Sequence, residues 1–266
     1  MNDTRLLRFT LLLLCALSGA CGRGFKLNRY NGNDALFGAA MDQYNRKKWD
    51  NAVLAFEKLT FDLPARDTLL PVAHWFLAKS YSGRNEHLLA AQAFNRLAES
   101  FATDSLADNA MFLAAKEYQA LWRRPTLDAN YGEQALAAYQ SLLGLYPDTE
   151  LKAETDTQMG QLQEWFAAKD YESGLYYFRR KAFDSAIIYF RDVVKNHPQT
   201  AKAREAQLRL AESYEATRYR EDKKEVCTAL QEKFPGDPEV RVICATPATT
   251  VTERPASDTT PLRKPL

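Results

Sequence analysis

The stretch AIIYFRDVVKNHP, residues 186–198, contains the pattern that decides the fold. In it, the small residue Ala186 is followed four positions later by Phe190 and three positions after that by Val193, and Pro198 closes the stretch. Offsets of four and seven place the three side chains on one face of an α-helix. Pro198 ends that helix, because proline has no amide hydrogen to donate and clashes with the preceding turn.

The same pattern occurs at four other places, so the chain consists of repeats. These places are Ala52/Phe56/Leu59/Pro64, Ala90/Phe94/Leu97/Ala102, Ala135/Tyr139/Leu142/Pro147 and the degraded Lys223/Cys227/Leu230/Pro235. A second helix precedes each of them, with a small residue followed by tyrosine, as in Ala78/Tyr81 and Ala211/Tyr214. This spacing resembles the tetratricopeptide repeat, whose hairpins stack because one hairpin cannot bury its apolar face alone. We therefore expect an all-α fold, an α-solenoid of about five such helical hairpins.

Two irregularities interrupt the predicted array. The third repeat has an insertion at residues 122–126, between its two helices. An extra long helix, roughly residues 151–169, is expected before the fourth repeat, with Met159, Leu162 and Phe166 spaced to pack against neighbouring helices.

Composition and motifs argue against several classes of function. The chain has 35 Lys and Arg against 34 Asp and Glu, without the basic surplus typical of nucleic-acid-binding proteins. None of the three histidines has a second ligand at helical spacing, so we expect no metal site. The sequence contains no Gly-rich phosphate loop, nucleophile elbow or paired acid motif. We expect no enzymatic activity, no catalytic residues and no cofactor.

The N-terminus has the features of a targeting signal. Arg5 and Arg8 precede an apolar stretch that is too short to span a bilayer, and LSGAC follows at residues 17–21. This motif resembles the lipobox of bacterial lipoproteins, which implies cleavage of a signal peptide (residues 1–20) and a diacylglycerol on the Cys21 thiol. The alternative is an ordinary secretory signal cut after Ala20. Because no Asp follows the cysteine, the resemblance implies the periplasmic face of the outer membrane.

Both ends of the mature chain lack apolar periodicity. Residues 21–33 are expected to form a lipidated tether, either as a plain flexible spacer or with Lys26 and Arg29 touching anionic headgroups. The tail, residues 246–266, is rich in Thr and Pro and has few large apolar residues, so we expect it to be disordered.

The order of these features resembles the BamD family, the lipoproteins of the machinery that assembles outer-membrane β-barrel proteins. The best local matches are WDNA at 49–52, the run 135–149 ending in YPDT, DYE at 170–172 leading into Tyr176-Tyr177, and VVKNHPQT at 193–200. The resemblance implies a non-enzymatic protein whose partners are the periplasmic domains of the BamA scaffold, the other lipoproteins of the complex and unfolded outer-membrane proteins. It also implies that repeats 1–3 (residues 34–148) form a substrate groove and that residues 149–245 bind the scaffold. The alternative is a repeat lipoprotein serving secretin or pilus assembly, or cell-envelope coordination.

Candidate groove residues are polar and aromatic side chains on the first helices of the hairpins. They are Gln43, Trp75, Lys79, Tyr118 and Trp122, and core packing is the alternative for the aromatic ones. Arg123 and Arg124 follow Trp122 and would clamp a peptide carboxylate through charge-assisted hydrogen bonds, or lie in a solvated loop.

The cysteines that remain after processing form one pair. Cys15 leaves with the signal and Cys21 takes the lipid, which leaves Cys227 and Cys244 in an oxidising compartment. A disulfide between them would tie the last helix to the segment that follows it. Because Cys227 occupies a position that is buried in the other repeats, a free core thiol is the alternative.

Overall fold

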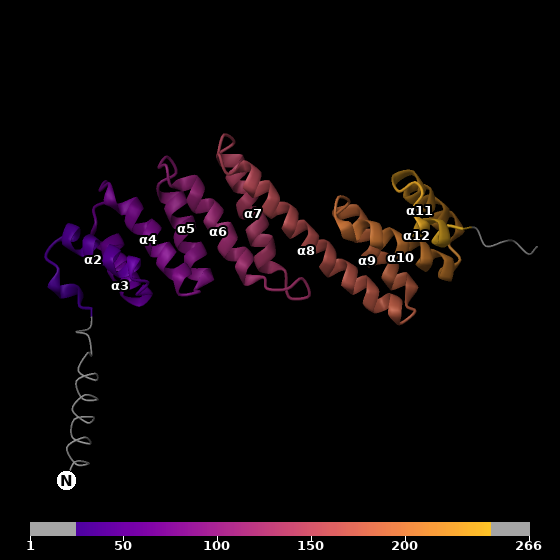
Figure 1. Ribbon diagram of the computed structural model, residues 1–266, viewed down its shortest axis with the longest axis horizontal. Helices are drawn as coiled ribbons and strands as arrows, with labels where there is room; N and C mark the ends of the chain where they lie inside the picture. The colour runs from indigo at the N-terminus through magenta and orange to yellow at the C-terminus, as the bar shows by residue number, and fades with distance from the viewer. Residues whose placement is uncertain (1–24, 246–266) are drawn as a thin grey trace, which may run out of the picture. The chain divides into compact units, whose positions relative to one another are not determined.

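The structure is a computed structural model that describes residues 25–245 (Figure 1). The signal peptide, Cys21 and the tail at 246–266 lie outside the described residues. Within them, one 3-10 turn and eleven α-helices follow each other without a strand. They are η1 (Leu27–Arg29), α2 (Asn33–Asn45), α3 (Trp49–Asp62), α4 (Leu69–Gly83), α5 (His87–Ser100), α6 (Ala107–Leu121), α7 (Asn130–Leu145), α8 (Lys152–Arg179), α9 (Phe183–Asn196), α10 (Ala201–Thr217), α11 (Arg220–Lys233) and α12 (Pro238–Ile243). None of these helices combines the length and apolar character needed to cross a membrane.

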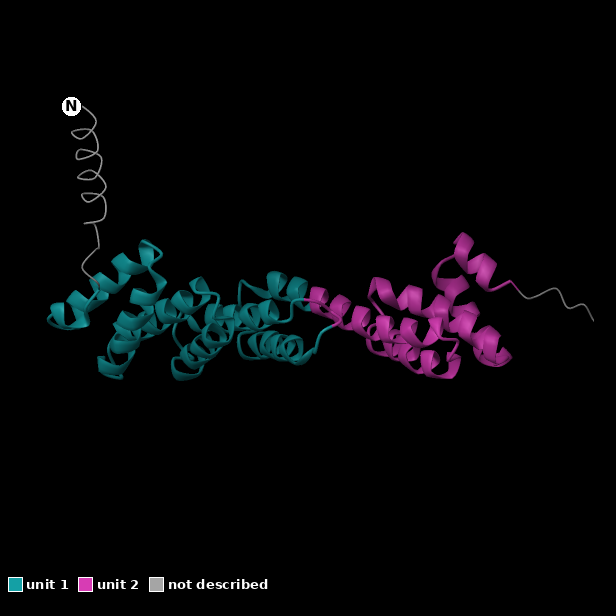
Figure 2. Ribbon diagram, turned by 90° about the horizontal axis from the view of Figure 1, so that it is seen from below, with its two compact units in different colours: residues 1–123, 127–159 teal, residues 124–126, 160–266 magenta. Residues whose placement is uncertain are grey.

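The chain divides into two compact units (Figure 2). Of the described residues, unit 1 contains 25–123 and 127–159, and its helices α2 to α7 pack in chain order as three hairpins. Unit 2 contains the described residues 124–126 and 160–245, in which α9 packs on α10, α10 packs on α11, and α12 packs on both α10 and α11. The all-α architecture of stacked hairpins is confirmed, whereas the division of roles between residues 34–148 and 149–245 stays a prediction.

The repeated pattern marks the buried face of each hairpin. Ala186, Phe190 and Val193 are fully buried, and the matching positions of the first three repeats are at most 1% exposed. In the fifth repeat Cys227 and Leu230 are buried too. Each buried Phe or Leu side chain contributes about 1.5–3 kcal/mol, which makes this face the main source of stability.

The ends of the second helices follow the prolines. Helices α3, α7, α9 and α11 each end two residues before a proline, because the residue before proline disfavours the helical conformation. The tight turns between paired helices each contain one residue with a left-handed backbone, which the sequence pattern does not mark. These residues are Lys47, Asn85, Lys181 and Arg218.

Three glycines admit an aromatic ring against the helix backbone. A Cβ atom added at these glycines would lie 2.1–2.6 Å from the nearest ring atom, far inside van der Waals contact. The pairs are Gly83 with Trp49, Gly132 with Trp122, and Gly174 with Phe190. Glycine is needed at these positions for close approach.

The extra helix differs from the expectation in one respect. It does not end near residue 169 but continues as the first helix of the fourth repeat, giving the single 28-residue helix α8. The reason is that no proline or turn motif separates the two segments, and Ala167, Ala168 and Lys169 all favour helix. The expected packing of Leu162 is confirmed, since its side chain is 1% exposed.

Candidate interaction surfaces

Two of the predicted groove residues lie together on α4. The Nζ atom of Lys79 lies 5.9 Å from the centre of the Trp75 ring. This is a cation–π contact between two side chains one helical turn apart. The other side of Trp75 packs edge-on against Phe94 with ring centres 5.5 Å apart. Trp75 is therefore half core and half surface, and Lys79 covers its outer part.

Two other candidates connect neighbouring helices. The Oε1 atom of Gln43 accepts a hydrogen bond of 2.8 Å from Asn51, which links α2 to α3. The Tyr118 hydroxyl accepts one of 3.3 Å from Asn95, which links α6 to α5. Burial raises the pKa of Tyr118, so its hydroxyl stays protonated and can also donate.

Trp122 is a core residue, as the alternative interpretation had it. Its side chain is 1% exposed and its ring lies against Gly132 at the start of α7, where it anchors the long loop between α6 and α7. Trp122 therefore cannot line an open groove. Arg123 and Arg124 are exposed, in keeping with a solvated loop.

A hollow between α5, α6 and α7 was not predicted. Its volume is about 410 Å³, and its lining residues are Asn95, Ala98, Glu99, Ala102, Met111, Ser141, Leu145 and Tyr146. Leu145 at its rim is 67% exposed, and the Tyr146 hydroxyl donates a 2.9 Å hydrogen bond to the carbonyl of Ala102. The hollow therefore offers apolar side chains, one amide and one carboxylate to a ligand.

Glu117 lies at the centre of a polar cluster in unit 1. Glu117 accepts a bond of 2.5 Å from the Ser82 hydroxyl and contacts Nδ1 of His87 at 2.6 Å. Ser82 and His87 therefore both bind one carboxylate, which ties α4 and α5 to α6. Among residues 25–245, no group of side chains is suited to hold a metal ion.

An exposed aromatic surface in unit 2, the tyrosine patch, consists of Tyr176, Tyr177, Arg180 and Tyr189. The Tyr177 and Tyr189 rings stack with centres 5.4 Å apart, so they join α8 to α9. The Arg180 guanidinium lies 4.0 Å from the centre of the Tyr176 ring, and Tyr176 is 51% exposed. Tyrosine and arginine are enriched in the energetic centres of protein interfaces.

The part of α8 in unit 2 also fixes the ends of later helices. Gln163 contacts Nδ1 of His197 at 2.7 Å, and Glu164 accepts hydrogen bonds from the backbone amide of Ala201, the first residue of α10. Burial lowers the pKa of His197 and raises that of Asp170, whose carboxylate is 3.7 Å away. Both shifts favour the neutral forms, so burial weakens this contact as an ion pair.

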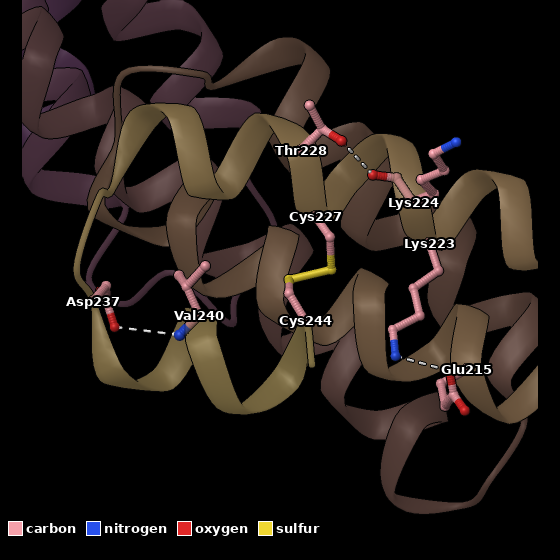
Figure 3. The surroundings of a disulfide bond; sticks show 8 residues. All are labelled: Glu215, Lys223, Lys224, Cys227, Thr228, Asp237, Val240 and Cys244. Atoms are coloured by element: carbon pink, nitrogen blue, oxygen red, sulfur yellow. Dashed lines mark hydrogen bonds and ion pairs between the residues drawn. A yellow bond between two sulfur atoms is a disulfide. The ribbon is translucent and has the colours of Figure 1, made fainter. Parts of the chain in front are cut away.

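Cys227 and Cys244 are joined by a disulfide (Figure 3). The bond ties α11 to the end of α12, with the two Cα atoms 5.4 Å apart. Helix α12 is held further by Val240, which is 1% exposed, and by Asp237, which caps the helix and pairs with Arg204 of α10. The short last helix therefore completes the core of the fifth repeat.

Comparison with known proteins gives matches over most of the chain. The family described as "YfiO: Outer membrane lipoprotein" matches residues 30–230. The outer membrane protein assembly factor BamD of Caulobacter vibrioides is 25% identical over 234 residues, which cover 85% of this chain and 75% of that protein. BamD of Rickettsia prowazekii is 22% identical over 241 residues, which cover 88% and 93%. Among solved structures, the TPR2AB domain of yeast Sti1 in its pHSP90 complex gives a TM-score of 0.43 at 13% identity, over 80% of this chain and 81% of that chain.

Proposed function

Because this chain belongs to the YfiO family of outer membrane lipoproteins, we propose that it is an assembly factor for outer-membrane β-barrel proteins and acts by binding other proteins. The observation that carries the proposal is the family match over residues 30–230, which covers nearly all the described hairpins. The matched relatives are named assembly factors, and the resemblance to the BamD family inferred from the order of the repeats is confirmed.

The anchor is a diacylglycerol on Cys21, which holds the protein at the periplasmic face of the outer membrane. A thiol directly after LSGA at residues 17–20 supports this part of the proposal. A Cys21→Ala variant should leave the membrane pellet for the soluble fraction. Its persistence in the pellet would mean that protein contacts, and not lipid, retain it.

The tyrosine patch is the surface proposed for the periplasmic domains of a BamA-like scaffold. Its support is composition and exposure: two stacked tyrosines and a third, 51% exposed, under an arginine. Such aromatic and arginine side chains account for most of the affinity in many interfaces.

The surface proposed for unfolded outer-membrane proteins lies in unit 1, at Trp75, Lys79 and the hollow between α5, α6 and α7. The hollow accepts an apolar side chain, while the amide of Asn95 and the carboxylate of Glu99 can bind the polar backbone around it. An extended segment with alternating aromatic and polar residues has this chemistry.

The test is recovery of partners from detergent-solubilised membranes with three variants. Tyr176→Ala with Arg180→Ala should lose a barrel protein with periplasmic repeats, and Leu145→Asp should keep it but lose cross-links to unfolded outer-membrane polypeptides. Val242→Asp is the matched control, because Val242 is 76% exposed and lies on neither surface. Recovery of a secretin in place of the barrel protein would refute the proposal.

A further inference from the structure

The N-terminal segment of the described chain is folded onto the first hairpin. Phe25, Leu27 and Tyr30 pack against the core that contains Leu59 and Leu63, and the Phe25 and Tyr30 rings lie 5.5 Å apart. The expected flexible spacer therefore does not extend beyond residue 24. The position of Phe25 is therefore fixed by its packing against the first hairpin.

The short distance in sequence between Phe25 and Cys21 keeps the first hairpin close to the lipid. Cys21 precedes Phe25 by four residues, and four extended residues reach at most about 14 Å. A lipid on Cys21 therefore holds the adjoining end of the hairpin within about 14 Å of the bilayer surface.

The exposed residue Phe61 lies at the same end of the hairpin. Helices α2 and α3 are joined by a three-residue turn and pack together, so they run antiparallel and the last turn of α3 lies beside the start of α2. Phe61 is in that last turn with 88% of its side chain exposed, and Leu54, two turns earlier on the same face, is 45% exposed. No contact within the described chain accounts for this exposed ring.

The charges at this end suit an anionic surface. Lys26, Arg29 and Arg66 are exposed, and none of them forms an ion pair with a described residue. Of the nearby carboxylates, Asp62 pairs with Lys58 and Asp67 accepts a bond from the backbone amide of Leu69. Glu57, one turn before Phe61, accepts a hydrogen bond from the Tyr81 hydroxyl. Asp34 remains, in the first turn of α2, where the helix dipole stabilises it.

We propose that Lys26, Arg29, Phe61 and Arg66 form a membrane-facing surface that rests on anionic phospholipid. The three basic side chains bind phosphate groups, and the Phe61 ring enters the headgroup region, where aromatic side chains are favoured. The acyl chain on Cys21, on which this inference rests, keeps the surface at high effective concentration next to the bilayer. The first hairpin is thereby held in a defined orientation on the membrane.

The test uses the full lipidated protein in vesicles of phosphatidylethanolamine and phosphatidylglycerol. With Cys21 lipidated and Cys227 bonded to Cys244, Phe61→Cys provides the reactive thiol for a fluorescent label. Asn45→Cys is the matched control, because Asn45 is exposed at the far end of α2, about 20 Å away along the helix axis.

We expect nitroxide-labelled lipids to quench the label at residue 61 several-fold more than the label at residue 45. Reversing the three basic residues to Glu should reduce the quenching at residue 61. Equal quenching at both sites would overturn the proposal. A second result would also overturn it: the label at residue 61 is not quenched by the lipids and is also shielded from iodide in the water. In that case a second copy of the chain or another protein covers residue 61.

Discussion

Replacing Gly132 with alanine tests the packing of the longest loop between paired helices. The new methyl carbon would lie 2.1 Å from Cε3, 2.5 Å from Cζ3 and 2.9 Å from Cδ2 of the Trp122 ring. Ordinary carbon–carbon contacts are about 3.5–4.0 Å, so the ring must move by about 1.5 Å. Because Trp122 is 1% exposed, its ring is enclosed by other parts of the chain and can move only if they move with it. Overpacking of this kind costs about 1–3 kcal/mol.

Thermal unfolding followed by circular dichroism measures this cost. For a chain of this size a loss of about 2 kcal/mol lowers Tm by about 4–8 °C. Gly144→Ala is the matched control in the same helix, since no atom lies within 4 Å of its Cβ position. That variant should gain about 0.5–1 kcal/mol from the better helix propensity of alanine.

A double-mutant cycle decides whether the ring is responsible. In a Trp122→Leu background the clash is reduced, so Gly132→Ala should lose most of its destabilising effect. If Gly132→Ala raises Tm as Gly144→Ala does, Trp122 does not occupy this position and the account of the loop is wrong.

Three further predictions concern unit 2 and the pH dependence of stability. Phe190→Ala should lower the free energy of unfolding by about 3–5 kcal/mol in denaturant titrations, because it removes a fully buried ring; an unchanged midpoint would contradict the burial. The double variant Cys227→Ser with Cys244→Ser removes the disulfide that closes a 17-residue loop, and the free energy of unfolding should fall by about 3 kcal/mol. In this variant the amide hydrogens of α12 should exchange faster, while those of α9 should not change. Burial lowers the pKa of His74 and His197 below 6.5, so the unfolded chain binds protons first and stability should fall as the pH drops from 6.5 through the lowered pKa values. Replacing both histidines with Gln should flatten that part of the stability–pH curve, and an unaltered slope would refute the assignment.

The hairpins could be predicted because their signal is local. Offsets of four and seven within one helix place Ala186, Phe190 and Val193 on one face, and all three are fully buried. The sequence does not predict that the extra segment and the next helix form the single helix α8, because the only sign of this is that no stop motif lies between them. The sequence pattern predicts where the extra segment lies, before the fourth repeat, but not that it continues into the next helix.

The surfaces were harder to predict than the core because they depend on which helices come together. The hollow beside Leu145 combines residues from three consecutive helices, and it depends on how they pack together. The aromatic type of Trp122 leaves both groove and core open, whereas its packing against Gly132, ten residues later, shows that it is core. Tyr176 and Tyr177 belong to a motif that resembles the BamD family, but the stacking of Tyr177 on Tyr189 depends on the packing of α8 on α9.

The disulfide sets the path of mechanical force at the C-terminal end. A pull on residues beyond Cys244 passes through the sulfur atoms into Cys227 and α11, so α12 lies inside a closed loop and carries no load. Only after reduction would a stretched molecule release this loop, gaining about 60 Å of contour length. A force applied by a partner to the end of the chain therefore acts on the fifth repeat and does not unfold the six-residue helix α12 first.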